Sequence, residues 1–207
     1  MKNIYIIIGL LILVFSCSSV KHLNSDAFTS EEKKLIMNAD SNTTLRVLKT
    51  TNKSDSLALR MKSTYIKPDP NNSVLKKFTK RLYATVRDSI SMGVGIAAPQ
   101  VGIKKNIIWV QRFDKENLPF EVYLNPKIIS YSDTTQTVRE GCLSIPNRSE
   151  TLSNRSQEII IEYNTMENIH NTETIEGFTA VIFQHEIDHL NGILYLDYVI
   201  KDSTSSN

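Results

Sequence analysis

The chain has 207 residues, of which 41% are hydrophobic, and this is enough for one globular domain with a substantial core. Its formal net charge of +2 creates no broad basic field, so nucleic acid is not expected as a partner. Its two cysteines, Cys17 and Cys142, do not support a disulfide framework.

The amino-terminal residues have the pattern of an exported protein. Lys2 precedes an apolar run over residues 4–15, which is short for a bilayer span but typical of a signal peptide. Ser16-Cys17 then resembles a bacterial lipobox, which implies cleavage after residue 16 and lipidation of Cys17. We therefore expect a signal peptide over residues 1–16 and a membrane-anchored lipoprotein on the periplasmic or outer-membrane side. An uncleaved anchor, or a wrongly assigned start before a cytoplasmic protein, is the alternative.

The next segments predict a tether and two helices. Residues 17–40 are expected to form the lipid-anchored tether and a short helix, since Thr29 and Glu32 make a capping-box pattern. Residues 40–56 are polar and predict a loop, with residues 45–48 the one stretch compatible with a strand. Ser73 is expected to cap a long amphipathic helix that ends at Gly93 and buries four apolar residues, Leu75, Phe78, Leu82 and Val86.

Short apolar stretches then predict strands at residues 106–113, 122–124, 128–131 and 158–163, with a turn at residues 125–126. Short strands followed by one C-terminal helix predict an α+β domain rather than a doubly wound one. We expect antiparallel or mixed sheets packed around that helix, in a domain spanning residues 41–200. Residues 201–207 are expected to be a flexible tail.

The predicted C-terminal helix carries an H-E-x-x-H pattern. His185 and His189 are four residues apart, so they lie on one face of a helix and can bind one metal ion. Glu186 can reach a metal-bound water without being a ligand. Phe178, Val181 and Ile182 precede His185 at helical spacing, which indicates that this face is also apolar and buried. A surface helix that carries two histidines by chance is the alternative.

A catalytic zinc or iron needs a third protein ligand. Tyr195 stands where the longer zincin pattern has its third histidine, and no glutamate follows Glu186. Cys142 offers a soft thiolate beside Gly141 and is the stronger candidate, with Asp197 the weaker one.

A segment of small residues, 93–100, lets the backbone approach another element or an extended peptide closely. No predicted strand precedes its G-x-G, which disfavours a dinucleotide site. Gln100 is either a turn residue or an amide directed into a site.

Three segments, residues 93–100 (GVGIAAPQ), 140–144 (EGCLS) and 184–189 (QHEIDH), resemble the three signature motifs of peptide deformylases in their order. Weaker similarity at residues 57–60, at Asn125-Pro126 and at Asp197 extends the resemblance over roughly residues 45–200.

The resemblance implies the fold of that family and removal of the formyl group from N-formylmethionyl peptides, with release of formate. By likeness, Cys142, His185 and His189 bind one divalent metal, Fe(II) in the native family enzyme, with Zn(II) or Ni(II) as substitutes. Glu186 would act as the general base. The Gln100 amide and the Leu143 N–H would donate to the formyl oxygen as negative charge develops on it. Gly93, Val94 and Gly95 would pair with the peptide backbone. Val94, Phe178, Val181 and Ile182 would line a methionine pocket, although ordinary core packing explains the last three equally well. We expect a monomer.

Two features depart from the family pattern. Arg148 and Arg155 each look displaced from the position at which family members carry an arginine after the motif cysteine. The lipoprotein-like start is unexpected because deformylation of nascent chains is a cytosolic task. The alternative function is a lipid-anchored module that binds metal or peptide on a deformylase scaffold without the activity. The presence of Glu186, Gln100 and all three ligands favours the enzyme.

Overall fold

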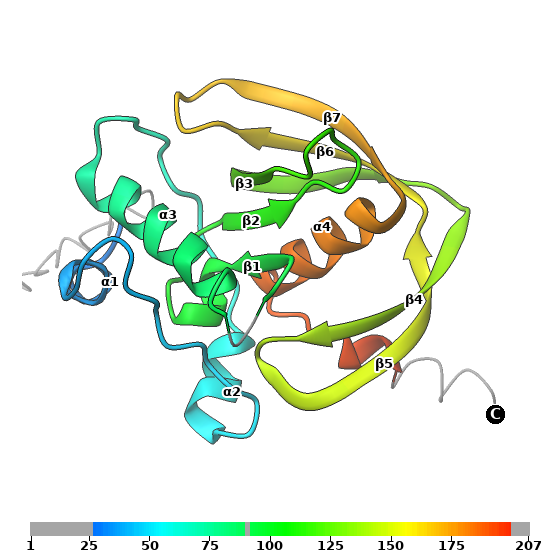
Figure 1. The fold of residues 1–207 in the computed structure, drawn as a ribbon, viewed down its shortest axis with the longest axis horizontal. Coiled ribbons are helices and arrows are strands. Elements are labelled where there is room, and N and C mark those ends of the chain that lie inside the picture. Colours follow the sequence, from blue (N-terminus) through cyan, green and yellow to red (C-terminus); the bar gives the residue numbers. More distant parts are fainter. Residues whose placement is uncertain (1–26, 90–91, 200–207) are drawn as a thin grey trace, which may run out of the picture.

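The computed structural model describes residues 27–89 and 92–199 (Figure 1). The expectations for the signal peptide over residues 1–16, for lipidation of Cys17 and for the tail over residues 201–207 lie outside these described residues. Within the two described ranges, no helix combines the length and the apolar character that a membrane crossing requires.

In the part of the chain that the structure describes, three helices precede the first strand. Helix α1, Ser30–Met37, begins with the expected capping box between Thr29 and Glu32. Helix α2, Lys53–Leu59, lies in the stretch that we expected to be a loop, because Asn52 caps it by accepting from the backbone N–H groups of Ser54 and Asp55. Residues 45–48 form no strand.

Helix α3, Ser73–Val86, buries the four expected apolar residues. Two predicted boundaries of this helix were wrong. Asn72, not Ser73, is the cap, and its side chain accepts from the N–H groups of Val74 and Leu75 at 3.0 Å each. The helix also ends at Val86, well before Gly93, because Arg87 at the C-cap already leaves the helical conformation.

Five strands form one antiparallel sheet with the order β1-β2-β3-β6-β7, and two more form the hairpin β4-β5. Their bounds are β1 Gly95–Ala97, β2 Ile107–Gln111, β3 Phe120–Tyr131, β4 Thr135–Cys142, β5 Ile145–Ser156, β6 Glu158–Asn164 and β7 His170–Glu176, with a 3₁₀ helix η1 at Ala98–Val101. The α+β prediction is therefore confirmed, with every pairing between named strands antiparallel.

The predicted turn at residues 125–126 was wrong. Strand β3 continues through Asn125 and Pro126, and the irregularity is a bulge at which Asn125 has φ +52°. The side chain of Asn125 stabilises the bulge, since it bonds both the N–H and the carbonyl of Ile66 at 2.9 Å. A polar residue followed by proline thus marked a bulge instead of a chain reversal.

Helix α4, Gly177–Leu190, lies between the five-stranded sheet and the β4-β5 hairpin (Figure 1). Ala180, Phe183 and Ile187 pack with buried residues of β2, β3, β6 and β7. Buried Gln184 anchors the other side, because its amide both accepts from Ser156 N–H and donates to Ser156 C=O at the end of β5. The helix is thereby fixed in rotation, which decides where its two histidines point.

Candidate metal and active site

The site lies where α4 meets the end of β4. His185 and His189 come from successive turns of α4, and Cys142 is the last residue of β4. The ligand atoms of these three residues lie within 4.8 Å of one another, and Cys142 Sγ is 3.2 Å from His189 Nε2. One thiol and two imidazoles are a donor set suited to zinc or iron, so the three residues fit one divalent metal.

Asp197 is not part of this group. Its carboxylate pairs with Arg60 through two hydrogen bonds and also accepts from the N–H of Leu194. Asp197, the weaker of the two candidate third ligands, was therefore wrong. It is close to the histidines in sequence, but its carboxylate is paired with Arg60. Of the two sequence candidates, only Cys142 lies with the histidines.

Glu140 orients the first histidine. Its Oε2 lies 2.7 Å from His185 Nδ1, which directs the other ring nitrogen, Nε2, toward the metal position. Burial alone would raise the pKa of Glu140, but hydrogen bonds from His185 and Arg155 outweigh it and hold that pKa at about 2. Glu140 is therefore a carboxylate that accepts from the imidazole.

Arg155 supports the site, contrary to our expectation that it was displaced. Its side chain is 3% exposed, and it donates to Glu140 through Nε at 2.6 Å and to Asp188 through Nη1 at 2.7 Å. Arg148 instead pairs with Glu150 at 2.8 Å, with about half of its side chain exposed. The expectation failed because the β4-β5 register shifts at two places, between Gln136 and Val138 and between Gly141 and Cys142.

Glu186 is buried beside the three ligands. Its Oε2 has no hydrogen-bond partner among the described residues, as expected of a carboxylate that faces a position for water or substrate. Burial raises the pKa of Glu186 to about 7, although the neighbouring imidazoles oppose the rise. A carboxylate with a pKa near neutrality is suited to accept and return a proton.

Gln100 has a fixed amide orientation. It lies in η1 with 1% of its surface exposed, and its Oε1 accepts from the N–H of Ala97 at 2.8 Å. Its Nε2 therefore points to the site, 3.5 Å from Cys142 Sγ and 3.3 Å from Ser144 Oγ. Of the two interpretations of Gln100, the structure favours the amide directed into a site. Ser144 belongs to the segment 140–144, but no role was predicted for its side chain.

A cavity of about 800 Å³ opens next to these groups. Gln100, Cys142, Leu143, His185 and Glu186 line it. All six residues that we expected to bind substrate line it as well: Gly93, Val94, Gly95, Phe178, Val181 and Ile182. Val181 and Ile182 are nearly buried, whereas Phe178 is 44% exposed. Ile182 belongs to the core and to the cavity wall at once, so the two interpretations of this helix face do not exclude each other.

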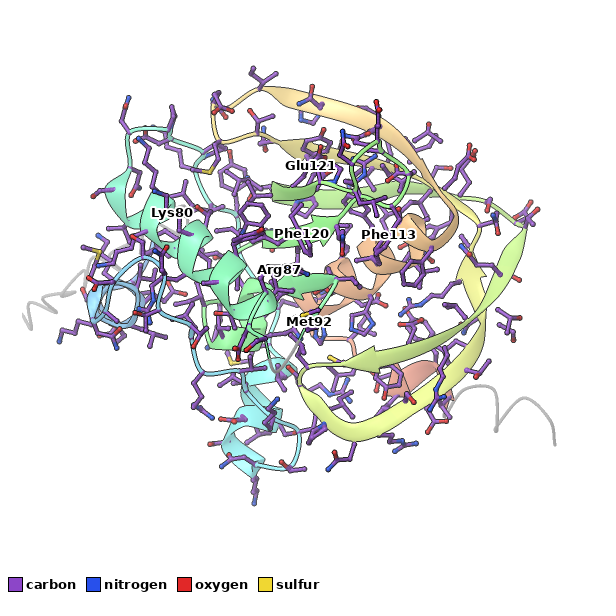
Figure 2. All side chains as sticks on the ribbon, viewed as in Figure 1. Lys80, Arg87, Met92, Phe113, Phe120 and Glu121 are labelled. Carbon is purple, nitrogen blue, oxygen red and sulfur yellow. The ribbon has the colours of Figure 1, made fainter. Side chains whose placement is uncertain are left out.

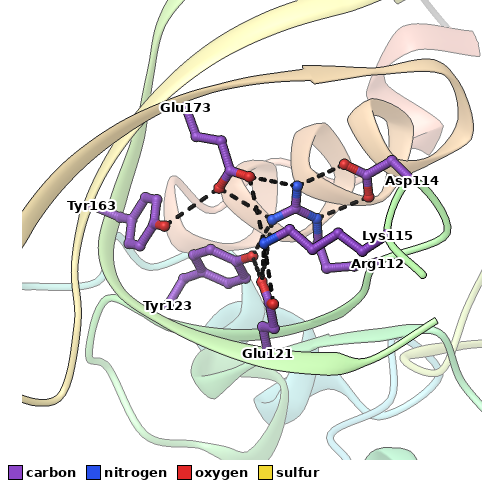
Figure 3. Close-up of polar contacts among 7 residues, drawn as sticks. All are labelled: Arg112, Asp114, Lys115, Glu121, Tyr123, Tyr163 and Glu173. Atoms are coloured by element: carbon purple, nitrogen blue, oxygen red, sulfur yellow. Dashed lines mark hydrogen bonds and ion pairs between the residues drawn. The ribbon is translucent and has the colours of Figure 1, made fainter. Parts of the chain in front are cut away.

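Phe178 packs against Phe113, with ring centroids 5.3 Å apart. In Figure 2, Phe113 and Met92 are labelled on the viewed face of the molecule, where α4 is visible between the five-stranded sheet and β4. Phe113 directly follows Arg112, which is 1% exposed and donates to Asp114 and Glu173 (Figure 3). Arg112 also donates to Glu121 of β3, and Glu173 lies in β7, so this one side chain connects the start of the loop to two strands. The network thus fixes the loop after β2 that carries Phe113.

Gly95 approaches Glu186 more closely than any other residue type would allow. A Cβ at this position would lie 2.5 Å from Glu186 Oε1 and 2.8 Å from Ile182 Cγ2. Glu186 is thus confined by the backbone of β1 on one side. This contact connects the small-residue segment to the geometry of the carboxylate.

We expect Gly95→Ala to lower kcat/KM by about 10–100-fold, because even a shift of about 1 Å in a reacting group costs this much. Gly141→Ala is the matched control, since a Cβ there would meet only Ser149 Cβ at 3.9 Å. The contact is tested by measuring kcat/KM of both variants with an N-formylmethionyl peptide, and circular dichroism checks that both are folded. Equal losses in the two variants would show that close approach at Gly95 is unimportant.

Comparison with known proteins agrees with this geometry. A sequence model of the polypeptide deformylase family matches residues 45–205. The peptide deformylase of Prochlorococcus marinus (strain NATL2A) is 38% identical over 132 residues, which cover 63% of this chain and 64% of that protein. The peptide deformylase of Desulforudis audaxviator (strain MP104C) is 42% identical over 120 residues, covering 57% of this chain and 75% of that protein.

A solved structure shares the fold. The Met-Ala-Ser-bound crystal structure of the class I type b peptide deformylase of Acinetobacter baumannii has a TM-score of 0.65 and 32% identity. The match covers 76% of this chain and 99% of that one. The Cys142, His185 and His189 group is a metal site of the kind typical of that family.

Proposed function

This chain belongs to the polypeptide deformylase family, and from that premise we propose that it hydrolyses the formyl group of N-formylmethionyl peptides. The products are formate and a peptide with a free amino terminus. The observation that carries the proposal is one cavity lined by Cys142 and His185 of the three-residue metal site, by Glu186 and by the oriented amide of Gln100. Glu186 Oε2 there has no hydrogen-bond partner among the described residues. A binding module would need neither Glu186 nor the amide of Gln100 in these positions.

Cys142, His185 and His189 would hold the metal, and Fe(II) is the ion that we propose. When bound, such a metal acts as a Lewis acid and lowers the pKa of water. The thiol suits this role, because the imidazoles of His189 and His185 overcome the effect of burial and lower the pKa of Cys142 well below its usual range.

Glu186 would accept the proton of the attacking water and return it to the departing amine. Its burial and its position beside the ligands support both transfers. Gln100 Nε2 and the backbone N–H of Leu143 would donate to the oxygen of the formyl group as negative charge develops there. The bond from Ala97 N–H holds the Gln100 amide in the donating orientation before substrate arrives, so no reorganisation is needed during the reaction.

Backbone groups of Gly93 to Gly95 would pair with the substrate, and Val94, Val181 and Ile182 would contact the methionine side chain. A formyl group is the smallest acyl group, so a confined site can reject larger acyl groups by size. The glycine at position 95, where a Cβ would meet Glu186, is consistent with a substrate backbone that passes close to the base.

The test is formate release from formyl-Met-Ala-Ser by the full-length protein, purified without oxygen and loaded with Fe(II). We expect formate from the formyl peptide and no hydrolysis of the acetyl peptide. A protein that binds one equivalent of metal and yet releases no formate would favour the alternative, a metal- or peptide-binding module.

The lipid anchor remains a prediction from residues 1–17. We expect wild-type protein in the membrane fraction with an acylated Cys17 at its amino terminus, because several acyl chains give stable attachment. Cys17→Ser should move the protein to the soluble fraction or leave an unprocessed precursor. Fractionation with mass spectrometry of the amino terminus tests this, and a wild-type chain in the cytosol starting at Met1 would contradict it.

A further inference from the structure

Three basic side chains line the cavity and lie in two different parts of the chain. Lys49 precedes α2, Arg139 lies in β4 and Arg148 lies in β5. Lys49 is half-buried, whereas Arg139 and Arg148 are exposed. The cavity wall also contains two acidic residues, Glu140 and Glu186, and both of these are buried.

The charges at the rim are not balanced. Arg148 is paired with Glu150 at 2.8 Å. Arg139 donates through Nε to the hydroxyl of Ser149 at 2.8 Å, and Lys49 Nζ donates to the carbonyl of Leu143. Over the described ranges, neither of these two cations forms a salt bridge with a carboxylate, unlike Arg148 and Arg155 on the β4-β5 hairpin. The open part of the cavity is therefore net positive.

The fold places these cations on the wall of the same cavity as the reacting groups. Strand β1 is at the edge of the five-stranded sheet, and the β4-β5 hairpin lies across the cavity from it. Lys49 is held beside Leu143, whose N–H is assigned to the oxyanion. A peptide that pairs with the backbone near Gly95 advances about 3.3 Å per residue, so the terminal carboxylate of a tripeptide stays within a cavity that Lys49 and Arg139 also line.

We propose that Lys49 and Arg139 bind a carboxylate on the substrate, and that the enzyme favours short formyl peptides with a free C-terminal carboxylate. This inference rests on the proposed deformylase function. In a formylated di- or tripeptide the terminal carboxylate is one or two residues from the methionine, within the cavity. An acidic side chain at the same place would present the same chemistry.

The experiment compares kcat/KM for formyl-Met-Ala-Ser with a free carboxylate and for the same peptide as a C-terminal amide, at low ionic strength. The expected preference for the free acid is about three- to tenfold, the size of one or two partly exposed ion pairs. We expect the preference in KM, because the terminal carboxylate does not react, so its contact is the same in the ground state and in the transition state. It should shrink toward one at about 0.5 M salt, where exposed charges are screened.

Substitutions test which residues cause the preference for the free acid. Arg139→Gln and Lys49→Gln should each reduce the acid-to-amide ratio by about two- to threefold, and the double variant should bring it close to one. The amide nitrogen of glutamine stands where Arg139 has Nε, so Arg139→Gln keeps a donor for Ser149. Lys80→Gln on α3, outside the cavity, is the control and should keep the wild-type ratio (Figure 2).

A wild-type ratio of one, or a double variant with an unchanged ratio, would overturn the carboxylate site and leave the deformylase function intact. Formate from neither peptide would contradict the proposed function, and the carboxylate proposal would fall with it. A second pair, formyl-Met-Ala-Glu-amide and formyl-Met-Ala-Gln-amide, locates the carboxylate. A preference for the glutamate peptide would show that the site also accepts acidic side chains. Equal kcat/KM for the glutamate and glutamine peptides, together with a preference for the free acid over the amide of formyl-Met-Ala-Ser, would restrict the site to the terminal carboxylate.

Discussion

Glu186→Gln is expected to leave the metal bound and to lower kcat by roughly 10²–10⁴-fold, the usual contribution of a positioned general base. Glutamine has the shape of glutamate, so the close contact with Gly95 and the packing of α4 are retained. What is lost is the ability to accept a proton at Oε2, the atom that has no hydrogen-bond partner among the described residues. Formate release at saturating substrate, with metal analysis of the same sample, measures both parts of the prediction.

Glu167→Gln is the matched control, since Glu167 is exposed in the turn between β6 and β7. It should retain wild-type turnover. A Glu186→Gln protein that binds metal and keeps more than about a tenth of the wild-type kcat would exclude Glu186 as the base. Loss of metal in this variant would instead point to a ligand role, which the geometry does not suggest.

The sequence predicted the parts of the site that depend on local geometry. His185, Glu186 and His189 lie within one helix, and the spacing of a helix alone decides that the two histidines share a face. The capping box at Thr29 and Glu32 is likewise a contact within four residues. Cys142 required a further argument, because only the chemistry of the thiol connects it to histidines more than forty residues away.

Contacts set by strand register could not be predicted in this way. Arg155 reaches Glu140 and Asp188 only because β4 and β5 pair with two irregularities, and an extra residue in a strand leaves no clear mark in the sequence. Strands β4, β5 and β7 were missed for a related reason. All three are rich in polar residues, so they lack the apolar runs by which β2 and β6 were recognised.

The position of Lys49 shows the same limit. It lies in a polar stretch that reads as a loop, yet backbone bonds from Leu48 N–H to Gln100 C=O and from Thr50 N–H to Ser144 C=O fix this stretch against two signature segments. No periodicity reports such pairing, because it joins residues about fifty and ninety positions apart. The structure is needed to place a cation from this stretch at the cavity.

Cys142→Ser is expected to cost the protein most of its metal. A thiol ionises readily beside a cation, and a serine hydroxyl does so far less, so the third ligand would become a weak neutral donor. Removing a group that only supports a ligand already costs about 10–100-fold in metal affinity, and removing a ligand should cost at least as much. Metal content after gel filtration and titration of the apoprotein with Fe(II) or Zn(II) measure the loss.

Asp197→Asn is the control, because Asp197 was the other candidate ligand and is instead paired with Arg60. It should keep one equivalent of metal even if the loss of that pair lowers stability. One equivalent retained by Cys142→Ser, with a metal-free Asp197→Asn protein, would reverse the assignment. A third measurement follows from the thiolate and the proposed ion: wild-type protein loaded with Fe(II) should lose activity in air faster than protein loaded with Ni(II). Equal lifetimes of the Fe(II)-loaded and Ni(II)-loaded proteins in air would argue against oxidation at an Fe(II)–thiolate site. The assignment of Cys142 as a ligand would then depend on the metal-binding measurements alone.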